Sequence, residues 1–161
     1  MKSKLLLFIL MLTCLLSIMG CSRVSDRPIV ESGSGGTSKH TILEPPILTI
    51  KVGEETINPA LGTYSWRIDN EDGTETVIES DSLAPPEMMN DNNSLQVTID
   101  TNVELNFEIQ PDRYSVRIWD GDNVVSASDK VVLSSKGKVI YEVLAHWEQG
   151  TASYVFSLEI E

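Results

Sequence analysis

Basic residues, histidines and cysteines are all scarce in this chain of 161 residues. Lys and Arg number 12 against 24 Asp and Glu, which gives a formal net charge of −12 at pH 7. Binding to nucleic acid requires a basic surface that displaces counterions from phosphates, so this balance argues against a nucleic-acid partner. The 2 cysteines are too few for a disulfide-dense scaffold. Stability must therefore come from apolar burial and backbone pairing.

The shortage of histidine also limits catalysis and metal binding. His40 and His146 are the only histidines, so a Ser-His-Asp or Cys-His site would depend on one of them. Structural zinc sites use four Cys or His ligands, whereas the chain has only two histidines besides its two cysteines at positions 14 and 21. A glycosidase needs a pair of carboxylates, and the chain has enough of them. With 24 acidic residues in so short a chain, however, some lie close together by chance, so such a pair is no evidence of catalysis. We predict a protein that is not an enzyme and has no catalytic residues, metal site or cofactor.

Two acidic turns, at 69–73 and 120–123, contain the oxygen ligands that calcium prefers. Neither matches the spacing of the EF-hand, because Ile68 falls where the first aspartate of that loop is required. We interpret both segments as solvated hairpin turns.

One long apolar run is present, and it lies at the N-terminus. Lys2 and Lys4 precede the apolar segment Leu5–Leu16, an arrangement typical of a secretory signal peptide. The run is shorter than the roughly 20 residues of a membrane-spanning helix. A cleaved signal is therefore the better interpretation.

The residues after this run resemble the lipobox of bacterial lipoproteins. Ile18 is the aliphatic residue at −3, Met19 lies at −2, and the small Gly20 lies at −1 before Cys21. The resemblance implies that residues 1–20 are a lipoprotein signal peptide, that the signal peptidase recognises Ile18, Met19 and Gly20, and that Cys21 carries the lipid. The mature protein would then be anchored in the bacterial cell membrane and face outside the cytoplasm. An ordinary secretory signal followed by a chance cysteine is the alternative.

Residues 21–46 are predicted to be a lipidated cysteine followed by a flexible tether. Ser32–Ser38 is a Gly/Ser run without periodic apolar residues, and Glu44-Pro45-Pro46 closes the segment. A coil of about 25 residues has an r.m.s. reach of roughly 25 to 30 Å, which would hold a domain clear of the membrane.

From residue 47 to residue 161 the apolar residues recur with a period of two, which predicts strands. The segment 81–93 breaks this rhythm, and Pro85 or Pro86 could begin one helical turn that runs through Met89. We predict an all-β fold, an antiparallel immunoglobulin-like β-sandwich of about seven to nine strands. The predicted strands are 47–52, 63–68, 74–79, 95–99, 103–109, 114–119, 124–128, 139–147 and 154–160, with 131–133 as a short additional edge.

Several short motifs also resemble a known group of proteins. They are Gly62–Trp66, Asp81–Glu87, Gly137–Val143, Trp147 and Tyr154–Phe156. Together they resemble small lipoproteins of Bacillus-type Firmicutes, and the final hairpin is similar to the closing strands of immunoglobulin-like sandwiches. The resemblance implies a location and a fold, and it implies no activity, because a shared sandwich does not carry a shared function.

Trp119 is the large aromatic residue that the strand pattern does not assign to the core. In the strand 114–119, Tyr114, Val116 and Ile118 share the apolar face, so Arg117 and Trp119 lie on the other face. An outward tryptophan near an arginine can anchor a partner or stack on a sugar. A bulge or an edge that covers the ring is the alternative. The candidate partner-binding residues are Arg117, Trp119, Asp120 and Asp122.

These observations predict a membrane-anchored lipoprotein that acts as a non-catalytic binding or protein-interaction module of the cell envelope. Its partner would be an envelope protein, a peptide or a wall polymer. Two alternatives stay open: a structural or regulatory accessory subunit of an envelope complex, and a protease inhibitor of the chagasin type.

Overall fold

The computed structural model describes residues 42–90 and 94–161. Ile18, Met19, Gly20 and Cys21, like the Gly/Ser run of the predicted tether, lie outside the described residues.

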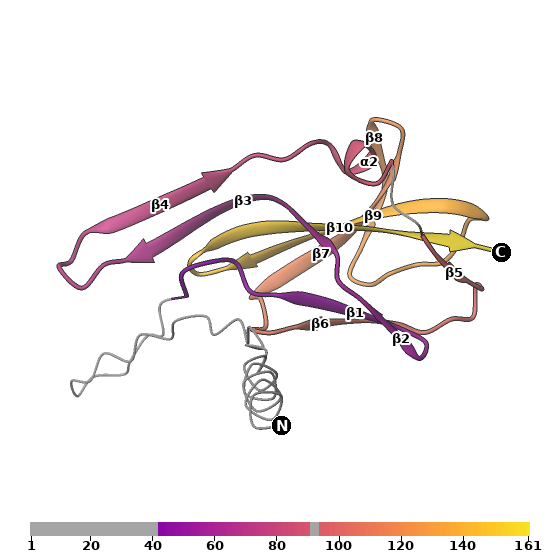
Figure 1. Ribbon diagram of the computed structural model, residues 1–161, viewed down its shortest axis with the longest axis horizontal. Helices are drawn as coiled ribbons and strands as arrows, with labels where there is room; N and C mark the ends of the chain where they lie inside the picture. Colours follow the sequence, from indigo (N-terminus) through magenta and orange to yellow (C-terminus); the bar gives the residue numbers. More distant parts are fainter. Residues whose placement is uncertain (1–41, 91–93) are drawn as a thin grey trace, which may run out of the picture. The chain divides into compact units, whose positions relative to one another are not determined.

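The described residues form an all-β fold with one helical turn (Figure 1). In chain order the elements are β1 (Leu48–Val52), β2 (Glu55–Ile57), β3 (Ala60–Asp69), β4 (Glu75–Ser80), α2 (Pro85–Met88), β5 (Leu95–Val97), β6 (Val103–Phe107), β7 (Arg113–Asp120), β8 (Asn123–Ser128), β9 (Gly137–Trp147) and β10 (Gly150–Ile160).

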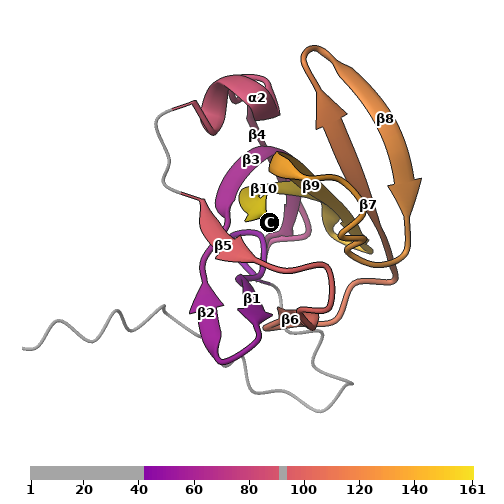
Figure 2. The same ribbon diagram turned by 90° about the vertical axis from the view of Figure 1, so that its right-hand side faces the viewer.

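Two sheets make up this architecture, as a β-sandwich requires. The smaller sheet has 3 strands in the order β2-β1-β6, and the larger has 7, in the order β4-β3-β10-β9-β7-β8 with β5 beside β10. Every pair is antiparallel except β5–β10, which is parallel. The long strands β9 and β10 lie at the centre of the larger sheet, and β1 and β6 lie across one of its faces (Figures 1 and 2).

The hydrophobic core fills the space between the two sheets. Alternate residues of β1 and β10 meet there, and Tyr141 stacks on Phe156 with ring centroids 5.0 Å apart. The buried members of this cluster are Leu48, Ile50, Val52, Val97, Phe107, Val116, Val139, Tyr141, Val143, Ala145, Ala152, Tyr154, Phe156, Leu158 and Ile160.

The predicted strands are present, and the differences have local causes. Ile99 and Ile109 lie beyond the ends of β5 and β6 and are exposed. At the first of these ends the main chain turns, with the amide of Thr101 donating to the carbonyl of Thr98. The predicted short edge 131–133 is not a strand. It is held instead by a side chain, since the Tyr141 hydroxyl donates to the carbonyl of Val132 at 3.0 Å.

Two further features of the sheets differ from the expectation. The short strand β2 was not predicted, because only one of its three residues is even partly buried and the alternation is too brief to recognise. The parallel β5–β10 pair departs from a wholly antiparallel sandwich. The prediction of one helical turn is confirmed. α2 begins at Pro85, where the missing N–H of proline costs no hydrogen bond, and Met89 is its C-cap residue.

The chain ahead of β1 is attached to the sandwich. The carbonyl of Ile42 accepts hydrogen bonds from Trp66 Nε1 at 2.8 Å and from Gln149 Nε2 at 3.0 Å. Gln149 Oε1 accepts from the Ile42 amide at 3.2 Å, so one side chain pairs with both backbone groups of Ile42. The Tyr154 hydroxyl donates to the carbonyl of Pro46, which is buried. These contacts hold residues 42–46 against the ends of β3 and β10.

Two glycines permit the close approach of β3 to β10. A Cβ at Gly150 would lie 2.0 Å from the Ser65 carbonyl oxygen, and a Cβ at Gly62 would lie 2.3 Å from Ser153 Oγ. The register between β3 and β10 shifts between Ala152 and Tyr154, near Gly62. A larger residue at Gly150 would push against the backbone of β3 and separate the two strands, whereas a larger residue at Gly62 would displace the Ser153 side chain.

Tyr141 provides a test of the core by pH. Burial raises the pKa of its hydroxyl to about 12. Between the ordinary value near 10 and this value, the unfolded state loses the proton while the folded state keeps it, so stability falls as pH rises. Chemical denaturation at pH 9 and at pH 11.5 measures how much free energy of unfolding each protein loses between the two pH values. We expect this loss to be larger for the native protein than for Tyr141→Phe, by about 2 kcal/mol. Equal losses in the two proteins would contradict this assignment.

Candidate functional site

Arg117 and Trp119 of β7, two of the predicted partner-binding residues, lie on the face of the larger sheet that points away from the smaller sheet. We call this the outer face. Arg117 pairs with Glu142 of β9, and Trp119 pairs with Ile140, whereas Ile118 pairs with the core residue Tyr141. Strand parity therefore separates Arg117 and Trp119 from the core, as the sequence pattern predicts.

Three side chains, those of Arg117, Trp119 and Glu142, are joined by hydrogen bonds on this face. Trp119 Nε1 donates to Glu142 Oε2 at 3.1 Å, and Arg117 Nη1 donates to the same oxygen at 3.5 Å. The Glu142 side chain is 11% exposed, and that of Arg117 is 36% exposed. A carboxylate at this depth requires compensation, which the guanidinium and the indole N–H supply. We call Arg117, Trp119 and Glu142 the Glu142 cluster.

The Trp119 ring itself is half-buried. The strand pattern left two alternatives open for Trp119, an outward ring or a ring covered by a bulge or an edge, and the structure contains an element of each. The β7–β8 register shifts between Ile118 and Trp119, so a bulge is present. The ring nevertheless stays on the outer face, with its position set by the bond to Glu142.

The two predicted aspartates lie apart from these bonds. Asp120 ends β7 and Asp122 lies in the turn before β8, and both are exposed. The four predicted residues thus divide into a pair in the cluster, Arg117 and Trp119, and a pair at the tip of the hairpin. Glu142 was missed. Its only sequence signal is an acidic residue within the otherwise apolar run 139–145, and its partners depend on the β7–β9 register.

His146 lies further along the same face of β9 and is half-buried. Partial burial lowers the pKa of its imidazole, and the positive charges of Arg113 and Arg117 lower it further. The imidazole is therefore neutral at pH 7 and adds no positive charge beside Arg117.

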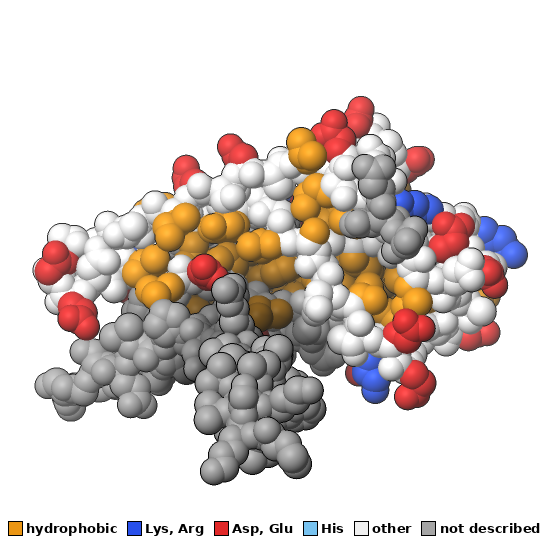
Figure 3. Space-filling view, viewed as in Figure 1, with side chains coloured by type: hydrophobic (Ala, Val, Ile, Leu, Met, Phe, Trp, Pro, Cys, Tyr) orange, Lys and Arg blue, Asp and Glu red, His pale blue; other side chains and the backbone are white. Residues whose placement is uncertain are grey.

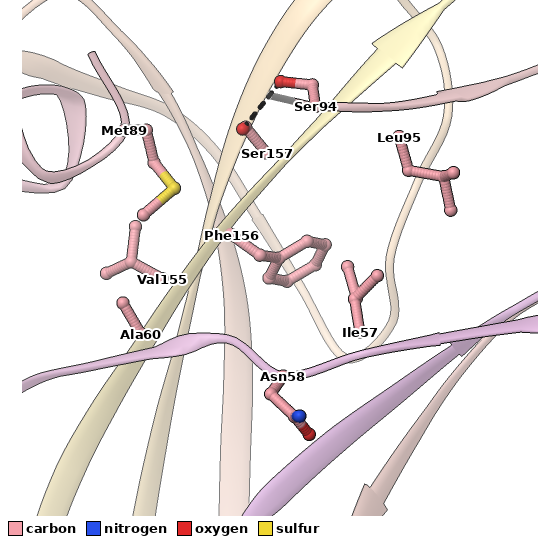
Figure 4. A pocket seen from close by; sticks show the side chains of 9 residues that line it. All are labelled: Ile57, Asn58, Ala60, Met89, Ser94, Leu95, Val155, Phe156 and Ser157. Atoms are coloured by element: carbon pink, nitrogen blue, oxygen red, sulfur yellow. Dashed lines mark hydrogen bonds between the residues drawn. The ribbon is translucent and has the colours of Figure 1, made fainter. Parts of the chain in front are cut away.

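A second feature, a pocket of about 550 Å³, lies where the pairing of β10 is interrupted (Figure 4). β3 pairs with β10 as far as Val155, and β5 begins to pair at Leu158, so neither strand pairs with Phe156 or Ser157. The pocket occupies this gap. Its lining residues are Ile57, Asn58, Ala60, Met89, Ser94, Leu95, Val155, Phe156 and Ser157.

The pocket is mainly apolar, with a few polar groups. Figure 4 shows the hydroxyls of Ser94 and Ser157 directed toward each other, 2.8 Å apart. The Phe156 ring and the Met89 side chain lie on either side of β10 in the same view. Such a lining suits a small apolar group. No sequence signal pointed to it, because its walls come from three separate parts of the chain, residues 57–60, 89 with 94–95, and 155–157.

Hydrophobic side chains are also visible on the surface. Figure 3 shows them gathered along β3 and toward α2, with acidic side chains mainly at the periphery of that view. Leu61 of β3, Val77 and Ile78 of β4, and Leu83 before α2 are among the large apolar residues that are exposed.

No family model, curated protein or solved structure matches this chain. Within residues 42–90 and 94–161, no helix is long and apolar enough to cross a membrane. In the same part of the chain, no three His, Cys, Asp or Glu side chains come together as metal ligands would. The function therefore has to be argued from the chain's own residues.

Proposed function

We propose that the protein is a lipid-anchored, non-catalytic binding module of the bacterial cell envelope, and that the Glu142 cluster is its binding surface. One observation carries this proposal: Trp119 is fixed beside Arg117 by the hydrogen bond of its indole to Glu142. Both supporting strands lie within the larger sheet. An aromatic anchor that is already ordered loses little conformational entropy when a partner binds.

The chemistry of the cluster defines the partner. The face of an indole binds a sugar ring or an apolar side chain, and a guanidinium binds carboxylates and phosphates through its remaining N–H groups. A partner with an apolar or ring surface beside such an acceptor would satisfy both groups. Envelope proteins, peptides and wall polymers all contain this combination.

The N-terminal part of the proposal rests on Ile18, Met19, Gly20 and Cys21. Cleavage after Gly20 and lipid on Cys21 would hold the domain at the outer surface of the cell membrane. The full chain has a net charge of −12, and loss of Lys2 and Lys4 with the signal peptide makes it more negative, which supports a domain that stands clear of anionic headgroups. The immunoglobulin-like subtype of the sandwich belongs to this proposal too, supported by the similarity of the β9–β10 hairpin to the closing strands of such domains.

Replacing Trp119 with alanine tests the binding surface. We expect the partner, captured by crosslinking in the native host and identified by mass spectrometry, to lose on the order of 2 kcal/mol of affinity, which is about thirtyfold. The Trp119→Phe variant keeps a ring and loses the Nε1–H, so it should lie between the native protein and Trp119→Ala. Both variants are also measured by chemical denaturation.

A structural role for the ring would give the opposite pattern. In that case Trp119→Ala would lose as much free energy of unfolding as the replacement of a fully buried tryptophan. The amount of partner captured per folded molecule would stay unchanged. This combination would disprove the proposed site. In a chagasin-type inhibitor, loops at the ends of the sandwich would contact the protease. If the protein inhibits a protease, and Trp119→Ala inhibits it equally well, that alternative would be favoured.

A further inference from the structure

The pocket beside Phe156 and Ser157 has a closed floor and an open rim. Met89, Val155 and Phe156 are 2%, 0% and 3% exposed, so packing holds these three side chains in place at the floor. Asn58 is exposed and lies at the rim. The volume of about 550 Å³ falls within the range of small-molecule sites, roughly 300 to 1,000 Å³. The pocket is therefore large enough for a ligand and can be reached from solvent.

The strand at the floor stays paired where its neighbours on one side end. β10 remains bonded to β9 across the gap, with Phe156 opposite Tyr141. The stacking of these two rings fixes one wall of the pocket. On the other side of β10, the Lys138 amine donates to the carbonyl of Met89. A site whose walls are already fixed loses little conformational entropy when a ligand binds.

The lining determines which charge a ligand can carry. None of the described residues that line the pocket is charged, in a chain with 24 Asp and Glu. Lys138 contacts the Met89 backbone and is not part of the lining. A carboxylate or an ammonium group bound there would lose its water without gaining an ion-pair partner from the lining, which is strongly unfavourable. The pocket therefore selects against charged ligands.

Two hydroxyl groups supply a polar contact within this lining. Ser94 Oγ and Ser157 Oγ lie 2.8 Å apart and share one hydrogen bond (Figure 4). Each serine has one O–H group, so this bond uses one of the two, and the other can donate to a ligand. Ser157 is buried and Ser94 is half-buried. A ligand oxygen that accepts from this pair is partly shielded from water, which strengthens the bond.

We propose that this pocket binds a small, uncharged molecule with an apolar ring or short alkyl body and an oxygen that accepts a hydrogen bond, as in an alcohol, a ketone or an amide. The apolar body lies against Met89, Val155 and Phe156, and the oxygen accepts from the serine pair. No lining residue belongs to the Glu142 cluster. This site is therefore separate from the proposed binding surface and does not rest on it.

A cysteine in the lining tests the site in the full-length protein. Ala60→Cys places a thiol in the pocket and leaves both serines in place. The probe is N-benzylmaleimide, an uncharged reagent with an aromatic ring and carbonyl oxygens that alkylates thiols. Because it binds in the pocket before it reacts, its labelling rate should level off as its concentration rises. Ala127→Cys, at an exposed position of β8, is the matched control and should give a rate proportional to concentration. The native sequence reports any contribution from Cys14 or Cys21.

A charged analogue tests the selectivity. With N-(4-carboxybenzyl)maleimide, labelling of Ala60→Cys relative to Ala127→Cys should fall on the order of tenfold, because the carboxylate has no partner in the lining. Rates proportional to concentration at both positions, or the same ratio of rates with both reagents, would overturn the proposal.

Replacement of both serines with alanine tests the polar contact. In the Ala60→Cys background, Ser94→Ala with Ser157→Ala should raise the half-saturating concentration of N-benzylmaleimide on the order of tenfold. An unchanged value would refute the hydrogen bond to the serine pair. Chemical denaturation shows that each variant is folded. If Ala60→Cys is destabilised, Asn58→Cys at the exposed rim provides the same measurements without a change in the core.

Discussion

Replacing Trp66 with alanine is expected to lower the free energy of unfolding by about 3 to 5 kcal/mol, the range for large aromatic residues in a core. Trp66 is 0% exposed, and its ring lies edge-on to Trp147 with centroids 5.6 Å apart. Its Nε1 also donates to the carbonyl of Ile42 at 2.8 Å. The alanine variant loses the packing and the hydrogen bond together, and leaves a cavity between β3 and the chain ahead of β1.

Denaturant titration of the native protein and the variant measures this loss. Trp66→Phe retains most of the ring and removes the hydrogen bond, so it should fall between the two. Val77→Ala, on the exposed strand β4, is the matched surface control and should change stability by less than about 0.5 kcal/mol. A Trp66→Ala effect no larger than that of the control would show that this end of the core is not packed as described.

The second large effect concerns the membrane anchor. Cys21→Ala should abolish lipid attachment and remove most of the protein from the membrane fraction, because burial of acyl chains contributes about 0.8 kcal/mol for each CH₂ group and two or more chains give stable anchoring. Fractionation of host cells, with mass spectrometry of the mature N-terminus, measures both consequences. Cys14→Ala, inside the predicted signal peptide, is the matched control and should leave anchoring unchanged.

Two results would contradict the predicted anchor. One is a native protein without lipid mass on Cys21. The other is a Cys21→Ala variant that remains in the membrane fraction at the native level with its signal peptide removed. An ordinary secretory signal predicts cleavage without lipid and release of both proteins from the membrane.

The strands that pack on the core could be located from the sequence because most of them bury one face and expose the other. In β6, Val103, Leu105 and Phe107 alternate with polar residues. The strand ends at Phe107, and the next apolar residue of the pattern, Ile109, is exposed. β10 is different, since Ser153, Val155 and Ser157 are buried as well as the core face. Its position at the centre of the larger sheet follows from pairing with β3, β5 and β9, and alternation alone does not contain that information.

The candidate site was predictable to the same extent. Parity within β7 was enough to separate Trp119 and Arg117 from the core. Glu142 becomes their partner only through the β7–β9 register, which joins residues 23 to 25 positions apart in the chain. The pocket at Phe156 depends on where β3 and β5 leave β10, and a gap between two strands has no local sequence pattern.

The contacts of Ile42 determine how mechanical load would enter the domain. A pull through the predicted tether first meets the hydrogen bonds that join Ile42 to Gln149 and Trp66, residues of the β9–β10 turn and of β3. β1, which is bonded to β2 and β6, comes later along the chain. A pulling force would therefore reach the larger sheet, through Gln149 and Trp66, before it reached β1. The pairing of β1 with β2 and β6 would be protected from that force as long as the contacts of Ile42 hold.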